Sequence, residues 1–174
     1  SPCCALVMLS AAGLERLKKT ESSSFSCDLR KWWDIMEAYE NGGHAYHATM
    51  PTDSLRRFRD IMKETEEYGF EKVLAEQQEL GDKVREMLVA KGIKSVASEG
   101  FQAPGVVVSY TNDKGIQTGK KFAELGFQIA AGVPLQCDEP EDYQSFRLGL
   151  FGLDKLHNIG RTVEKLEKAL DAIY

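Results

Sequence analysis

The sequence lacks the cysteine spacing that is typical of a metal site. It contains four cysteines (Cys3, Cys4, Cys27 and Cys137), and no two of them form a CxxC pair. Structural zinc sites take their ligands from closely spaced cysteine and histidine pairs, so we expect no metal. Adjacent cysteines such as Cys3 and Cys4 rarely bridge each other, and we therefore expect reduced, mostly buried thiols in a cytoplasmic protein.

A long apolar run and an excess of positive charge are also missing. The stretch CCALVML is far shorter than the roughly 20 residues needed to span a bilayer, and it lacks the flanks of a signal peptide. The formal net charge is -5, whereas a nucleic-acid-binding surface is basic. We therefore expect binding to neither membranes nor nucleic acids. Small anionic ligands are not excluded, because they respond to local charge.

The composition is that of an ordinary globular protein. The chain has 174 residues, of which 43% are hydrophobic, enough for one or two compact domains. It begins at Ser1 and runs directly into an apolar stretch. A strand without a preceding segment leads us to expect that the sequence is part of a longer chain.

The first half of the sequence predicts one strand followed by helices. Residues 4–9 (CALVML) have the pattern of a strand buried on both faces. Ser10 is placed to cap a helix, and apolar spacing predicts another helix over 31–39. After an irregular loop, Thr52 or Asp53 would cap further helical sequence up to residue 92. Gly69 interrupts that pattern, which is therefore either one long kinked helix or two helices in succession.

The second half changes to short strands between helices, and it predicts an α+β fold. In this fold, helices pack on one face of a small, largely antiparallel sheet. Asp154 is placed to cap the final helix, which carries an apolar stripe up to Ile173. A shorter helix is expected over 118–125, and strands are expected over 92–97, 103–111, 127–133 and 145–152.

The last expected strand, within QSFRLGLFG, places an arginine opposite an apolar face. Because strand side chains alternate, Phe146, Leu148 and Leu150 share one face, while Arg147, Gly149 and Phe151 share the other. An arginine on a covered sheet face is costly unless its charge meets an anion. The anion is either a carboxylate of the nearby acidic loop (Asp138, Glu139 or Glu141) or a carboxylate or phosphate of a ligand. A guanidinium holds a carboxylate through two parallel hydrogen bonds, and Gly149 would leave space for the ligand.

Two motifs resemble the class V pyridoxal-phosphate-dependent aminotransferases of the alanine–glyoxylate and serine–pyruvate group. SFRLGLFG matches the family's R-x-G-x-x-G pattern with Arg147, Gly149 and Gly152, and there the arginine holds the substrate's α-carboxylate. AYHATMP (residues 45–51) is similar to the family's Y-H-x-T-x-P segment. The resemblance implies that Tyr46 and Thr49 reach across a homodimer interface to the phosphate of pyridoxal 5'-phosphate bound by the other subunit. Without it, the same segment predicts only a helix-entry loop in which Thr49 is a local cap.

The N-terminal segment resembles the part of such enzymes that follows the cofactor lysine, although Cys3-Cys4 replaces the usual proline-glycine. The resemblance implies that the Schiff-base lysine lies upstream of Ser1, so this stretch alone should be inactive and holds no catalytic residue. Lys18, Lys19 and Lys31 lack the matching context. The resemblance also implies three parts: a remnant of the large cofactor-binding domain (1–52), a linking helix region (53–92) and the small C-terminal domain of a fold-type-I enzyme (93–174).

The intact protein is then expected to transfer an amino group between a small amino acid (alanine or serine) and a 2-oxo acid (glyoxylate or pyruvate). Related class V enzymes, such as phosphonate-specific, phosphoserine-type and cysteine desulfurase enzymes, stay open. Cys137, in the loop before the last strand, keeps the desulfurase among them. A further alternative is a non-catalytic small-molecule-binding or dimerisation module with the same fold. His44, His47 and His157 have no partner at a useful spacing, and we expect them to be ordinary polar residues.

Overall fold

The computed structural model describes residues 5–174, and the chain divides into two compact units, Ser1–Lys63 and Glu64–Tyr174. Each unit is described by itself. Cys3 and Cys4 lie outside the described residues. The three-part division expected from the sequence stays a prediction for the longer protein.

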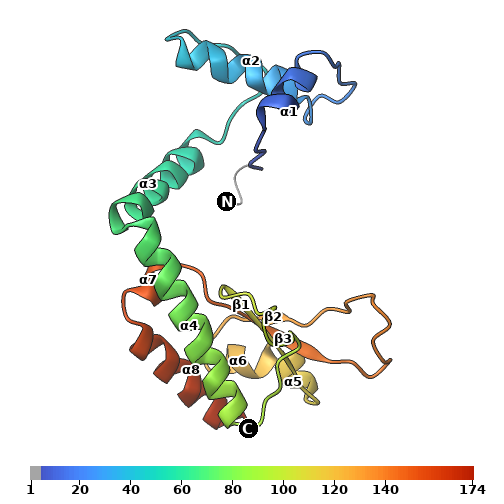
Figure 1. Cartoon of the computed structure of the whole chain (residues 1–174), viewed down its shortest axis with the longest axis vertical. Coiled ribbons are helices and arrows are strands. Elements are labelled where there is room, and N and C mark those ends of the chain that lie inside the picture. Colours follow the sequence, from blue (N-terminus) through green and yellow to red (C-terminus); the bar gives the residue numbers. More distant parts are fainter. Residues whose placement is uncertain (1–4) are drawn as a thin grey trace. The chain divides into compact units, whose positions relative to one another are not determined.

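The first unit is built from helices (blue to cyan in Figure 1) joined by long loops. Ser10 caps α1 (Ala11–Leu17) by accepting a hydrogen bond from the Gly13 backbone N–H at 3.1 Å, as predicted. Asp28 caps α2 (Leu29–Glu40) in the same way, because a short acceptor at this position satisfies an otherwise free N–H of the first turn. The third helix, α3 (Thr52–Tyr68), continues into the second unit. It begins at Thr52, so Thr52 and Asp53 lie in its first turn and the prediction that one of them is the cap was wrong.

The strand predicted at residues 4–9 does not form in the described part of that range. Residues 5–9 have no regular structure, and their side chains are exposed, with Met8 93% accessible. A strand needs a neighbour to pair its backbone N–H and C=O groups. None of the described strands pairs with this stretch, so its apolar sequence stays uncovered in this chain.

Gly69 separates α3 from α4 (Phe70–Ala90), which settles the choice between one helix and two. Its φ of 101° is a left-handed conformation that glycine adopts without steric cost.

None of the helices in the described part of the chain combines the length and apolar character that a membrane span requires.

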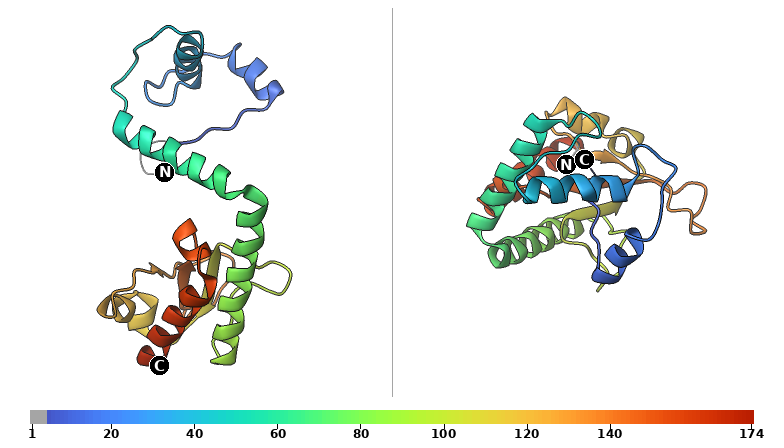
Figure 2. Two further views of the ribbon diagram at one scale, coloured as in Figure 1. Left: turned by 90° about the vertical axis from the view of Figure 1, so that its left-hand side faces the viewer. Right: turned by 90° about the horizontal axis from the view of Figure 1, so that it is seen from above.

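The second unit is a small antiparallel sheet covered by helices on one face, the α+β fold expected from the sequence (Figures 1 and 2). The strand order is β1-β3-β2, with both neighbouring pairs antiparallel. The strands are β1 (Val106–Tyr110), β2 (Ala130–Ala131) and β3 (Ser145–Gly149). The helices besides α4 are α5 (Lys114–Gln117), α6 (Lys120–Glu124), α7 (Leu153–Leu156) and α8 (Ile159–Ile173).

One hydrophobic core joins the sheet to its helices. Phe146 and Leu148 of β3 are almost completely buried, and so are Leu80 of α4 and Leu170 of α8. Each large side chain of this kind contributes roughly 1.5–3 kcal/mol when it leaves water. The helices cover only the face that Phe146 and Leu148 share, and this arrangement leaves Arg147 on the opposite face.

Three predicted elements of this unit were wrong in detail. The strand expected over 127–133 forms only at Ala130–Ala131. Residues 92–97 form only an isolated bridge between Ser95 and Ser109, because they pair with β1 through just two backbone hydrogen bonds. The final helix is interrupted: α7 ends at Leu156, and Asn158 caps α8 by accepting from the Arg161 N–H at 2.9 Å. Asp154, the expected cap, lies inside α7.

Candidate functional site

Arg147 lies in the middle of the open face of the sheet. In the register of the three strands it stands between Val108 of β1 and Ala130 of β2, and directly opposite residues of antiparallel strands share a face. Its side chain is partly exposed. The sequence argument assumed a covered face, and in this chain the face is open, so the cost of burying the charge does not apply here.

The Arg147 guanidinium is not neutralised by a carboxylate of residues 5–174. Its Nε donates a hydrogen bond to the Ala131 carbonyl oxygen at 2.9 Å, which fixes the side chain against β2. The two terminal nitrogens have no hydrogen-bond partner in the described part of the chain, and no acidic side chain there forms an ion pair with this arginine. Gly149, two residues further along β3, is exposed on the same face. The terminal nitrogens can therefore receive an external carboxylate end-on.

In the acidic loop before β3, the carboxylate of Glu139 accepts hydrogen bonds from the loop's own backbone. Glu139 accepts hydrogen bonds from the backbone N–H groups of Leu135, Gln136 and Cys137, the last two at 2.8 Å. Gln136 and Asp138 have positive φ angles of 59° and 63°, a conformation that turns successive N–H groups toward one point. Glu139, one of the three internal partners considered for Arg147, is therefore occupied within its own loop.

These hydrogen bonds lower the pKa of Glu139 from its usual 4.5 to about 2, chiefly through the Cys137 and Gln136 N–H groups. A depressed folded-state pKa stabilises the folded loop at pH above about 4.5, and this contribution is lost as the pH falls toward 2. We expect the amide resonances of Gln136 and Cys137, followed by NMR, to shift in that acid range. Glu139→Gln should remove the transition and Glu141→Gln should leave it in place. A Glu139 transition centred at its usual pKa would contradict the proposed N–H cradle.

Tyr46 and Thr49 are brought together in the first unit. The Tyr46 hydroxyl lies 3.3 Å from Thr49 Oγ1, in the loop between α2 and α3. The two hydroxyls share this hydrogen bond, in which one donates to the other. Tyr46 is 79% exposed, so both hydroxyls can exchange this bond for one to an external acceptor. Two adjacent hydroxyl donors suit a phosphate, which accepts several hydrogen bonds at once. Arg147 belongs to the second unit, and its geometry is therefore described for that unit alone.

Several residues near these positions were not expected from the sequence. Tyr110 lies on the open face next to the Arg147 row, and its ring meets Tyr143 edge-on, with centroids 5.7 Å apart. The alternation in VVVSY would have sufficed to place Tyr110 and Val108 on one face. The register that sets Val108 beside Arg147 was not readable from the sequence.

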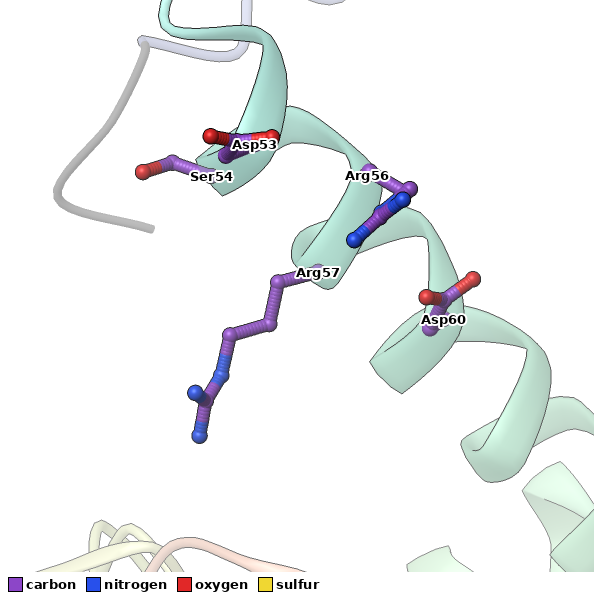
Figure 3. A pocket seen from close by; sticks show the side chains of 5 residues that line it. All are labelled: Asp53, Ser54, Arg56, Arg57 and Asp60. Atoms are coloured by element: carbon purple, nitrogen blue, oxygen red, sulfur yellow. The ribbon is translucent and has the colours of Figure 1, made fainter.

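A second unexpected feature is a hollow of about 460 Å³ along α3, which Figure 3 shows. Two arginines, two aspartates and a serine line it: Asp53, Ser54, Arg56, Arg57 and Asp60. Asp60 is already paired with Arg59. With both signs of charge balanced on one exposed helix face, this hollow indicates no particular ligand.

The remaining candidate residues are cysteines and histidines. Cys27 and Cys137 are free thiols, and both are exposed, which corrects the expectation of burial for these two. His157 packs against the ring of Tyr68, and His47 bonds to a backbone carbonyl. Within residues 5–174, no three histidine, cysteine, aspartate or glutamate side chains gather as a metal site would require.

Comparison with known proteins gives matches at the level of structure. No family model matches the chain, and no curated protein matches it by sequence. Among solved structures, an alanine–glyoxylate aminotransferase from Nostoc sp. superposes with a TM-score of 0.71 at 15% identity, covering 93% of this chain and 42% of that one.

Two further structures agree. An aspartate aminotransferase of subgroup IV from Thermus thermophilus gives a TM-score of 0.62 at 20% identity, covering 95% of this chain and 44% of that one. A ureidoglycine–glyoxylate aminotransferase from Bacillus subtilis gives 0.58 at 20% identity, covering 91% and 40%. The chain thus spans less than half the length of each of these three structures, and it has the fold of the corresponding part of an aminotransferase.

Proposed function

We propose that the chain is the C-terminal part of a pyridoxal 5'-phosphate-dependent aminotransferase of class V. The intact protein would move an amino group between alanine or serine and glyoxylate or pyruvate. The observation that carries the proposal is the Arg147 guanidinium, which is anchored by Ala131 and unpaired with any carboxylate of the described chain. The aminotransferase fold of the matched structures supports it.

Each residue of this chain has a defined task in the proposal. When bound, pyridoxal phosphate supplies the electron-withdrawing ring that makes amino-acid chemistry at the α-carbon accessible. Arg147 would hold the α-carboxylate of the substrate with its two terminal nitrogens and so orient the bonds at the α-carbon. The exposed hydroxyls of Tyr46 and Thr49 would donate to the cofactor phosphate held by a second subunit of a homodimer, and their 3.3 Å separation fits that donor set.

The stretch of 174 residues is proposed to be inactive by itself, since the cofactor lysine would precede it in the longer protein. The apolar side chains of Leu6, Val7 and Met8 are exposed. This supports the proposal, because another part of the longer protein would cover them. The described helices of the first unit that lie entirely within it, α1 and α2, contain no buried residue.

The test is an amino-transfer assay on the longer gene product, with alanine or serine as donor and glyoxylate or pyruvate as acceptor. We expect turnover with at least one pair and none with the chain alone. A protein that binds these acids without turnover would be the non-catalytic module instead.

The exposed thiol of Cys137 keeps a cysteine desulfurase as a second candidate. Release of sulfur from cysteine that is abolished by Cys137→Ser, without amino transfer, would favour that enzyme over the aminotransferase.

A further inference from the structure

The loop that carries Tyr46 and Thr49 is tied to the rest of its unit through His47. His47 Nε2 lies 2.9 Å from the Phe25 carbonyl oxygen. Since a carbonyl oxygen only accepts hydrogen bonds, the hydrogen of a neutral ring must reside on Nε2. Within the described residues, this is the one hydrogen bond that joins residues 44–49 to a different segment.

The imidazole ring is also held by two aromatic neighbours. The Phe25 ring lies against it at a centroid distance of 4.3 Å and an interplanar angle of 38°. The Trp32 ring meets it edge-on at 5.2 Å and 76°. Trp32 is fixed in turn, because its indole N–H donates to the Ser26 carbonyl oxygen at 3.0 Å. The ring of His47 therefore sits between the loop before α2 and α2 itself.

We infer that His47 is a positioning residue that holds the Tyr46–Thr49 hydroxyl pair in place for the phosphate. It is adjacent to Tyr46 and two residues from Thr49, so fixing its ring also fixes the backbone from which both hydroxyls project. A loop ordered before binding saves the entropy of ordering it at the moment of binding. This inference rests on the proposed function for the phosphate, but the ordering itself is a property of the chain alone.

The first arm of the test measures backbone order in the 174-residue chain by NMR relaxation. We expect the order parameters of Tyr46 and Thr49 to be near the rigid value of about 0.85, and His47→Ala to lower them toward about 0.6 or below. His47→Gln keeps an N–H that can reach the Phe25 carbonyl, and it should restore part of the order. His44→Ala is the matched control, because His44 is an exposed histidine of the same loop.

A spectroscopic signature separates this role from a general loss of stability. The Trp32 indole N–H resonance should shift in His47→Ala, since the edge-on ring is gone, while the amides of β3 should stay unchanged. If the order parameters of Tyr46 and Thr49 are the same in His47→Ala and in the parent chain, the inference is overturned.

The second arm measures pyridoxal phosphate affinity in the longer protein. His47→Ala should weaken binding about tenfold, or about 1.4 kcal/mol, with kcat at saturating cofactor retained. If Tyr46→Phe weakens cofactor binding but His47→Ala does not, the positioning role fails and the proposed function stands. If no version binds the cofactor, the proposed function fails, and the NMR arm still decides whether His47 orders the loop.

Discussion

Replacing Arg147 with alanine in the longer enzyme is expected to weaken binding of an amino-acid substrate by about 30- to 5000-fold. In the longer enzyme a bound substrate would cover the Arg147 guanidinium. Truncating one partner of such a buried, hydrogen-bonded charge pair costs roughly 2–5 kcal/mol, and each 1.4 kcal/mol is about a factor of ten. In the described chain the terminal nitrogens of Arg147 have no acidic partner. The loss would therefore come from the substrate's carboxylate and not from an internal ion pair. Steady-state kinetics should show it as a fall in kcat/KM.

The carboxylate itself can be tested by pairing the variant with a truncated substrate. Alanine and ethylamine differ by the carboxylate, so the penalty of Arg147→Ala should appear with alanine and vanish with ethylamine. Arg147→Lys keeps the positive charge and loses the planar fork. We expect it to fall between the parent and the alanine variant with alanine as substrate.

A matched control is available in the same unit. Arg161 is an exposed arginine at the start of α8, and Arg161→Ala should leave kcat/KM unchanged. Because Arg147 Nε also bonds to Ala131, thermal melting of each variant must be recorded beside its kinetics. An Arg147→Ala enzyme that melts normally and handles alanine as well as the parent would remove the basis of the proposed function.

Several parts of the fold that follow from local sequence were predicted correctly. The alternation of Phe146, Arg147 and Leu148 gave the two faces of β3, and burial follows it from Phe146 to Gly149, whereas Ser145 is buried on the Arg147 face. Ser10 capped its helix as expected. These features depend on a few neighbouring residues, whose periodicity and hydrogen-bonding capacity are visible in the sequence.

Two of the wrong predictions concern strands, which depend on distant partners. Residues 5–9 have the composition of a buried strand, but a strand forms only where another strand accepts its hydrogen bonds. Residues 92–97 do meet β1, yet only around Ser95. Asp154 looked like a helix cap, but Gly152, at φ 111°, already starts α7, and Asn158 starts α8. Composition alone does not decide between competing caps that lie four residues apart.

In the candidate site, too, features set by neighbouring residues were predicted and features set by distant residues were not. The motif gave Tyr46, Thr49 and Arg147, and their roles remain predictions. The sequence did not reveal that the Phe25 carbonyl and the Trp32 ring hold His47, because Phe25 lies in a different loop. Nor did it show that Glu139 is satisfied by its own loop, since that depends on positive φ angles at Gln136 and Asp138.

Gly132→Ala is expected to have the largest effect on the stability of the second unit. A Cβ built at Gly132 would lie 1.8 Å from the Ser145 carbonyl oxygen and 2.6 Å from Ser145 Oγ. Gly132 directly follows β2, and the first of these atoms belongs to the β3 backbone, so relieving the contact requires the chain at the end of β2 to move away from β3. Overpacking of this kind costs typically about 1–3 kcal/mol and sometimes more. Thermal melting followed by circular dichroism should show a midpoint lower by roughly 4–20 °C.

Gly149→Ala, in the neighbouring strand, supplies the comparison. A Cβ there would meet only the Phe151 ring at 3.9 Å, an ordinary van der Waals distance, so alanine should be neutral or slightly stabilising. Because β2 also provides the Ala131 carbonyl that anchors Arg147, Gly132→Ala in the longer enzyme should lower kcat/KM for alanine as well as the melting point. Equal melting points for the two glycine variants would show that β2 and β3 are not packed as closely as described. A close approach of these strands is therefore the condition on which both the sheet and the orientation of its arginine depend.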